Sequence, residues 1–310
     1  MTSNDSHLLC FANIQKNLKK PPGRPIVAST DSILSPLSIL LEKVLTLLIK
    51  KTPAFLLDTG AFLQIIHELG KTTGGYTFGN RIRATEQLLN MSQMDPRVIS
   101  FLLDLLKLVL IENFITFKDT FYVQVHGTAM GSNVAPTHAN GFMFTFESEF
   151  IYSNKLYQSH FILWRRYIDD VFCLWRGSHE SLLRFFDQIN SVWPELSFTL
   201  KYDCTEINFL DTKVIQKSDG TLMVDLYMKD TDRNNLLLYQ SCHPNAVKRS
   251  IPRSQFERVR RIVSDSTLCS QRLDEMEKKF LQRGYCYDLV ALEQHETYSG
   301  EGGTYTDRKP

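Results

Sequence analysis

Apolar residues recur every three or four positions in three stretches of the chain, which is the spacing of one buried helix face. Ser35-Pro36 and Asp95-Pro96 each place a capping residue before a proline, a common helix start. Pro53 interrupts the first stretch. The pattern therefore predicts helices over residues 35–57, 58–69 and 95–112, the second capped by Asp58 or Thr59.

Short runs of aromatic and β-branched residues, separated by polar turns, predict strands. Residues 113–125 predict a hairpin with Lys118-Asp119 at its turn, and Asp219-Gly220 predicts another turn. Other predicted strands cover residues 161–164, 171–175, 197–203, 207–215 and 222–228. Further helices are predicted at 141–152, 179–192 and beyond residue 250. This mixture of elements predicts the α+β class.

Two adjacent carboxylates, Asp169 and Asp170, interrupt the apolar stretch from Phe161 to Trp175. Their position predicts the tip of a β-hairpin. Burying two carboxylates costs several kcal/mol unless cations or hydrogen bonds compensate. A pair of divalent metal ions would compensate them, and phosphoryl transfer uses such a pair. The alternative is a solvated turn that happens to carry two acidic residues.

Three loops have compositions that bear on nucleotide contacts. Lys16 and Arg24 lie in or beside a Pro-rich basic loop that would suit a phosphate contact, although a solvated loop is the alternative. Residues 126–140 are small, which lets a backbone or a nucleotide approach closely. Residues 70–80 are rich in glycine but lack the spacing of a Walker A loop.

The segment from Lys248 to Arg283 is basic, with ten Lys or Arg residues against five acidic residues. Short basic helices joined by a turn are typical of a helix-turn-helix-like unit that lies along a nucleic-acid backbone. A solvated basic helical bundle is the alternative. The residues predicted to contact the backbone are Lys248, Arg249, Arg253, Arg258 and Arg261.

Composition changes this picture little. The chain has 310 residues, of which 43% are hydrophobic and 22% charged, with a net charge of +1, so any nucleic-acid surface must arise from local clustering. Six scattered cysteines without zinc-site spacing suit a reducing, intracellular compartment. No signal peptide and no membrane span is predicted.

Four segments, taken in order, resemble a reverse transcriptase, and within that class the Penelope-like retroelement proteins of animals. They are PPGRPIV (21–27), GTAMGSNVAP (127–136), RRYIDDVF (165–172) and INFLDTKV (207–214). The resemblance covers roughly residues 10–290. It implies a right-hand fold with fingers, a palm built on a small antiparallel sheet, and a helical thumb.

The resemblance also implies a division of the chain. Fingers and part of the palm would span 11–125, the rest of the palm 126–228, and the basic thumb 229–290. Disordered ends would cover 1–10 and 291–310. The implied activity is RNA-directed DNA polymerisation with an RNA template, a DNA primer, dNTPs and two Mg²⁺ (or Mn²⁺) ions. A nuclear rather than cytoplasmic location is implied by the resemblance alone.

The same resemblance implies roles for individual residues. Asp169 would be the main metal ligand, Asp170 would add charge to the metal site, and Tyr167 would pack near the primer end. The incoming nucleotide would meet Lys16, Arg24, Gly127, Ala129 and Met130. Phe209 and Leu210 would hold the primer backbone.

One departure bears on activity. Two-metal transfer needs carboxylates from two separate strands. The strand that should supply the first carboxylate, near residues 70–76, is missing, and no Asp or Glu lies between Glu68 and Glu86. We therefore predict an unpaired strand edge in the palm and lost or reduced polymerase activity. The functions left open are an impaired polymerase, a non-catalytic nucleic-acid-binding remnant, or an unstable transposon fragment without a cellular role.

Overall fold

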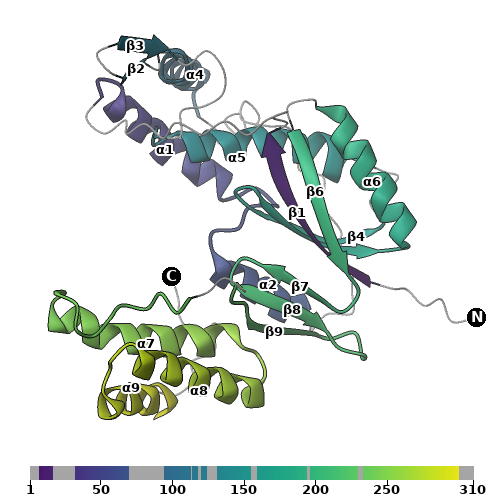
Figure 1. The fold of residues 1–310 in the computed structure, drawn as a ribbon. Helices are drawn as coiled ribbons and strands as arrows, with labels where there is room; N and C mark the ends of the chain where they lie inside the picture. The colour runs from purple at the N-terminus through teal and green to yellow at the C-terminus, as the bar shows by residue number, and fades with distance from the viewer. Residues whose placement is uncertain are drawn as a thin grey trace, which may run out of the picture. The chain divides into compact units, whose positions relative to one another are not determined.

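The computed structural model describes residues 7–16, 32–69, 94–112, 114–117, 120–123, 131–154, 159–193, 196–229 and 233–299. Contacts divide the chain into two compact units. The first draws its described residues from Met1–Leu57 and Tyr76–Lys201, and the second from Asp58–Gly75 and Tyr202–Pro310. Both units combine helices with small antiparallel sheets, which confirms the α+β class (Figure 1).

The first unit contains a four-stranded sheet with the order β4-β5-β1-β6. The predicted hairpin around the two carboxylates is confirmed. It consists of β4 (Phe161–Tyr167) and β5 (Asp170–Arg176), paired antiparallel. The other two strands are β1 (His7–Lys16) and β6 (Leu196–Asp203).

Strand β1 corrects two expectations. The prediction of a disordered N-terminus is wrong from residue 7 onward, because Leu8, Leu9 and Cys10 are buried in the sheet. The strand also runs antiparallel along β5, with Cys10 opposite Cys173. An unpaired strand edge was expected in the palm, but the β5 edge of the carboxylate hairpin is paired with the N-terminal strand.

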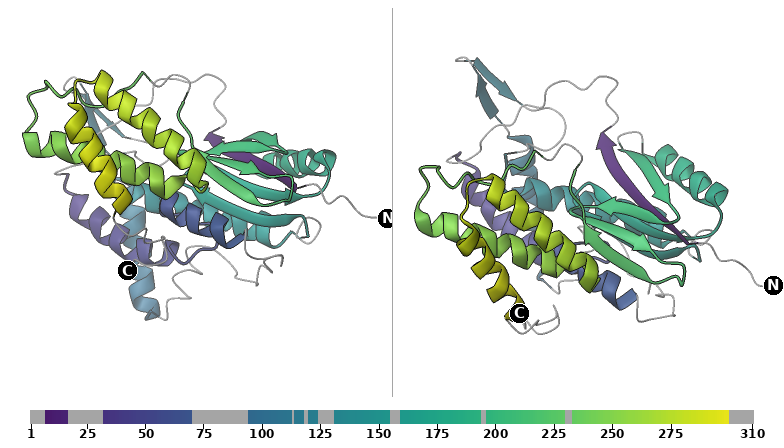
Figure 2. Two further views of the ribbon diagram at one scale, coloured as in Figure 1. Left: turned by 90° about the horizontal axis from the view of Figure 1, so that it is seen from below. Right: turned by 60° about the horizontal axis from the view of Figure 1, so that its bottom comes forward.

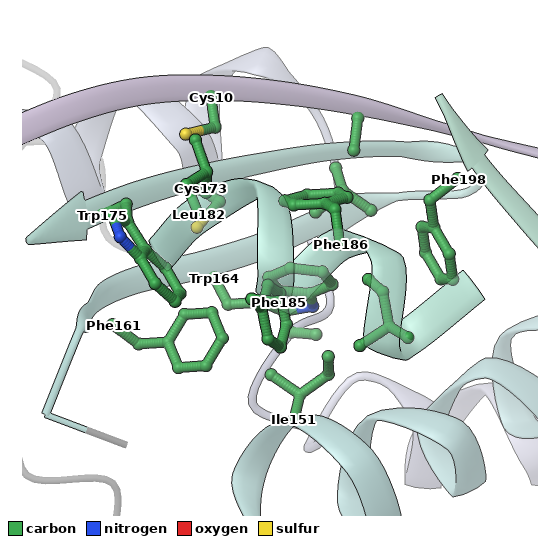
Figure 3. Close-up of a cluster of buried hydrophobic side chains, with 14 of the residues drawn as sticks. Cys10, Ile151, Phe161, Trp164, Cys173, Trp175, Leu182, Phe185, Phe186 and Phe198 are labelled. Atoms are coloured by element: carbon green, nitrogen blue, oxygen red, sulfur yellow. The ribbon is translucent and has the colours of Figure 1, made fainter. Parts of the chain in front are cut away.

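An aromatic core lies between this sheet and the helices α6 (His179–Val192), α5 (Ala135–Phe146) and the π-helix η1 (Glu147–Tyr152). Figure 3 shows its side chains packed together. The Trp175 ring centroid lies 5.1 Å from that of Phe161 and 5.3 Å from that of Phe185. Burying each large apolar side chain contributes about 1.5–3 kcal/mol, so this cluster fixes the hairpin in place.

A second core joins α5 to α1 (Ser35–Ile49) and α4 (Pro96–Ile111). The loop predicted over residues 126–140 is wrong from Ala135 onward, where α5 begins with a proline in its first turn. Its small residues instead let α5 pack closely on α1, with 3.2 Å between the hydroxyl oxygens of Thr46 and Thr137. The predicted hairpin near residues 113–125 is confirmed as β2 (Phe114–Phe117) and β3 (Thr120–Val123).

The second unit contains α2 (Thr59–Leu69) and a three-stranded sheet of β7 (Glu206–Phe209), β8 (Thr212–Gln216) and β9 (Leu222–Leu226). As predicted, Asp58 caps α2, its carboxylate accepting the Ala61 amide at 2.8 Å. Three further helices pack on one another: α7 (Asn245–Ile262), α8 (Ser266–Gln282) and α9 (Tyr287–Ser299) (Figure 2).

Helix α9 corrects the prediction of a disordered tail from residue 291. The helix continues to Ser299. Val290 is fully buried, and α9 packs against α7. The weak apolar pattern of this segment concealed a helix that is stabilised by its neighbours. The fingers, palm and thumb boundaries remain predictions.

Candidate functional site

The two predicted metal ligands lie at a strained turn. Tyr167 and Asp170 form the last pair of the β4–β5 hairpin, and Ile168-Asp169 is its two-residue loop. Ile168 has φ = 55°, a conformation that glycine normally supplies at this kind of turn. A β-branched residue at positive φ stores about 1–3 kcal/mol of strain. Ile168 and Asp169 are both exposed, so packing of their own side chains does not hold the turn in this conformation. The support comes from residues beneath the turn.

A buried polar network supplies that support. The Arg166 and Glu147 side chains are 1% and 0% exposed, and the Arg166 Nε donates to Glu147 Oε1 at 2.7 Å. The second Glu147 oxygen accepts Arg166 Nη2 at 3.2 Å, and Trp164 Nε1 donates to Oε1 at 3.2 Å. Arg166 Nη1 donates to Asn140 Oδ1 at 2.5 Å. Such complete pairing compensates the desolvation of both charges.

The same arginine reaches the strained turn. Arg166 Nη1 donates to the Ile168 carbonyl oxygen at 3.2 Å. The backbone of Arg166 also bonds with the segment before α2, donating to Ala54 O at 2.7 Å and accepting from Leu56 N at 3.0 Å. Sequence reasoning missed the roles of Arg166 and Glu147. The available signal was the acidic residue Glu147, directly after Phe142, Phe144 and Phe146, although the nearby Glu149 carries the same charge.

The strand beside the carboxylates is β1, and its register places Asn13 opposite Asp170. The Ile14 amide donates to the Asp169 carbonyl oxygen at 2.8 Å. A two-metal centre needs a carboxylate at or near such a position, and asparagine carries no charge. Among the described residues, no group of three or more His, Cys, Asp or Glu is arranged to hold a metal ion. The described donors do not fit a pair of Mg²⁺ ions.

Of the other residues expected near a nucleotide or primer, the structure describes Lys16, Phe209 and Leu210. Lys16 ends strand β1, whereas Arg24, Gly127, Ala129 and Met130 lie outside the described residues. Phe209 and Leu210 belong to the β7–β8 hairpin of the second unit. Phe209 is fully buried, with its ring centroid 4.7 Å from that of Phe62, which leaves only its backbone for a primer contact.

Helix α7 carries six basic residues and one acidic residue, Glu257. Its buried side consists of Lys248, Pro252, Phe256, Val259 and Ile262. Along the exposed side, Arg249, Arg253 and Arg261 follow one another at multiples of four residues, so they form one ridge. Arg253 Nε is 3.2 Å from Glu257 Oε1 within that ridge.

The two remaining predicted backbone contacts are held inside the second unit. Lys248 is buried, donates from Nζ to the Ser241 carbonyl oxygen at 3.3 Å and lies 5.2 Å from the Tyr239 ring centroid. Arg258 donates from Nε and Nη2 to Asp211 Oδ2 at 3.1 and 2.9 Å. The structure therefore separates an outward set, Arg249, Arg253 and Arg261, from an inward set, Lys248 and Arg258.

Comparisons with known proteins bear on the same helices. Residues 235–290 match the animal helix-turn-helix domain family, a segment that includes α7, α8 and the start of α9. No curated protein matches the chain. Among the described residues, no helix is long and apolar enough to cross a membrane.

Among the solved structures that are similar to the chain is that of telomerase from Candida albicans in complex with a TWJ fragment of telomeric RNA. The identity is 11% and the TM-score 0.40, over 96% of this chain. The chain spans 45% of the length of that telomerase chain. A likeness at this level does not establish a shared fold.

Proposed function

We propose that the protein binds nucleic acid through the exposed arginine ridge of α7 and does not polymerise it. The observation that carries this proposal is the sorting of the α7 cations, since Arg249, Arg253 and Arg261 are exposed while Lys248 and Arg258 are engaged within the unit. Exposed guanidinium groups along one helix suit the phosphates of a duplex backbone. The match of residues 235–290 to a helix-turn-helix family supports the same proposal.

The second candidate is RNA-directed DNA polymerisation by a Penelope-like reverse transcriptase, with Mg²⁺ at Asp169 and Asp170. The strained, exposed turn at Ile168 favours it, because strain is often kept where a side chain must be presented. The uncharged residue opposite Asp170 weighs against it. We propose that the chain derives from a retroelement polymerase, as the four resembling segments imply, and that its present function is binding.

The test is fluorescence anisotropy with a labelled RNA–DNA hybrid and a labelled DNA duplex, between about 50 and 200 mM salt. The variant Arg249→Gln/Arg253→Gln/Arg261→Gln removes the ridge. We expect weaker binding and a plot of log K against log salt that is shallower by about three, since each lost phosphate contact removes about one.

The matched control is Lys43→Gln/Lys50→Gln/Lys51→Gln, which removes the same charge from exposed positions of the first unit. We expect the control to keep the wild-type slope. Equal losses in the two variants would mean that net charge alone governs binding, and the proposal would then be wrong.

A further inference from the structure

The small sheet of the second unit contacts the helix-turn-helix segment at three places, although it precedes the matched residues 235–290. The first contact is at the β7–β8 turn. Asp211 accepts Arg258 of α7 through Oδ2 and Thr59 of α2 through Oδ1, the latter at 2.5 Å. The pair is about one-third exposed, with 33% for Arg258 and 27% for Asp211. One aspartate thus joins a strand turn, α2 and α7.

The second contact lies at the turn between α7 and α8. The Ser264 amide donates to the Val224 carbonyl oxygen at 2.9 Å, and the Val224 amide donates to Ser264 Oγ at 2.9 Å. The helix-turn-helix turn is therefore bonded to strand β9 in both directions. Asp265 then caps α8 by accepting the Leu268 amide at 3.0 Å.

The third contact joins β9 to α8. Asp225, which is 4% exposed, accepts Arg272 Nη2 at 2.6 Å and Nε at 3.0 Å. Arg272 also donates from Nη1 to Glu275 at 2.9 Å. Hydrogen bonding to Asp225, followed by that to Glu275, raises the pKa of the Arg272 guanidinium. This contact fixes α8 as the Asp211 contact fixes α7.

We propose that the β7–β8–β9 sheet is the platform that sets α7 relative to α8, and that Asp211 and Asp225 are positioning residues for nucleic-acid binding. This inference rests on the proposed function. The platform directs Arg258 and Arg272 inward and leaves the ridge of Arg249, Arg253 and Arg261 facing outward. The nucleic-acid-binding unit then includes strand residues that precede residues 235–290.

The direction in which binding changes after removal of a negative charge distinguishes a positioning role from a simple electrostatic effect. Replacing an acidic residue near a cationic surface makes that surface more positive, which strengthens binding to a polyanion. Loss of positioning weakens binding instead. Asp211→Asn and Asp225→Asn therefore test the proposal, and Asp274→Asn is the matched control, since Asp274 lies exposed on α8.

Binding is measured by anisotropy of the full chain with the labelled duplexes, at a temperature where circular dichroism shows every variant to be folded. We expect Asp211→Asn and Asp225→Asn each to weaken binding by about 3- to 10-fold, with the salt slope unchanged. We expect Asp274→Asn to bind as the wild type or slightly more tightly.

The double variant Asp211→Asn/Arg258→Gln keeps the net charge and leaves no unpaired group, so it remains informative if Asp211→Asn does not fold. We expect it to weaken binding as much as the single variant. Wild-type affinity in the double variant would overturn the proposal. Tighter binding of Asp211→Asn, with a salt slope steeper by about one, would also overturn it, because Arg258 would then be a phosphate contact.

Failure of this inference is distinguishable from failure of the proposed function. If the ridge variant weakens binding but the Asp211 and Asp225 variants do not, only the platform is refuted. If the ridge variant binds as the wild type does, the interface on α7 is itself refuted.

Discussion

Two hairpin turns have the same φ at their first loop residue but differ in the contacts of their aspartates. Ile168-Asp169 closes β4–β5 and Leu210-Asp211 closes β7–β8, and both Ile168 and Leu210 have φ = 55°. The Asp211 carboxylate accepts Thr59 and Arg258. The Asp169 side chain is exposed and makes no hydrogen bond or ion pair within the part of the chain that is described.

The comparison shows that two turns with the same strained φ are stabilised by different contacts. In the first turn, Arg166 holds the Ile168 carbonyl from beneath, and Glu147 holds Arg166. In the second turn, the aspartate itself is the anchor, and its carbonyl oxygen also accepts the Tyr227 amide at 3.0 Å. An aspartate that anchors a helix has a structural role, whereas one presented to solvent above a rigid support is free to meet a ligand.

The largest expected effect comes from the support of the first turn. Glu147→Ala leaves Arg166 buried without its partner, and we expect a loss of about 3–5 kcal/mol in the free energy of unfolding. Urea denaturation measures this loss. The control is Glu180→Gln on α6, where the pair with Arg184 is 70–75% exposed and contributes at most about 0.5 kcal/mol. Equal losses would mean that the buried network does not hold the turn.

Exchanging each aspartate for alanine tests the comparison directly. We expect Asp211→Ala to lower the free energy of unfolding by about 1–2 kcal/mol, because a half-buried Arg258 and Thr59 lose their acceptor. Asp169→Ala should change it by less than about 0.5 kcal/mol, as at other exposed positions. Similar values for the two variants in urea denaturation would contradict the distinction between the turns.

Position 13 tests whether a third carboxylate would create a metal site at the first turn. Asn13 and Asp170 are register partners of the antiparallel strands β1 and β5, so Asn13→Asp would add a third carboxylate at this pair. We expect Mn²⁺ to raise the thermal midpoint of this variant but not that of the wild type. The stabilisation would reach about 1.4 kcal/mol at ten times the dissociation constant.

The control for position 13 is Asn13→Asp/Asp170→Asn, which should lose the response to Mn²⁺. If Mn²⁺ stabilises the wild type to the same extent, the donors already present are sufficient to bind the metal. The claim that Asn13 on β1 leaves the metal site incomplete would then be wrong.

The smallest effect concerns the strain itself. Glycine adopts φ = 55° without steric penalty, so Ile168→Gly should stabilise the fold by about 0.5–1 kcal/mol. Leu210→Gly should gain less, since Leu210 is half-buried and its packing is lost. A loss of stability in Ile168→Gly would indicate that the Ile168 side chain is held by contacts stronger than its exposure of 51% suggests.

Local patterns predicted the local structure well. The start of α1 at Ser35, the caps at Asp95 and Asp58 and the carboxylate hairpin follow from neighbours in the chain, and the structure confirms them. The predicted cap at Ser35 is wrong, because Ser35 is already helical and Leu34 holds the cap position without a side-chain bond. Strand β1 was not predicted, because its short apolar run acquires meaning only beside β5, about 160 residues later.

The same limit applies to the candidate site. Sequence identified the basic α7 segment but could not separate Arg258 from Arg253, since the partner of Arg258 lies 47 residues away. Lys248 looked like a phosphate contact because its charge is visible in sequence and its burial is not. Long-range contacts, rather than residue type, decide which cations face outward.

The most direct test of the central claim is Mg²⁺- and Mn²⁺-dependent primer extension on a poly(rA)/oligo(dT) duplex, with binding of the same duplex followed by anisotropy. The account predicts a salt-sensitive complex and no extension with either metal. Extension that disappears in Asp169→Asn/Asp170→Asn would contradict it, because a carboxylate from another part of the chain would then complete the metal centre.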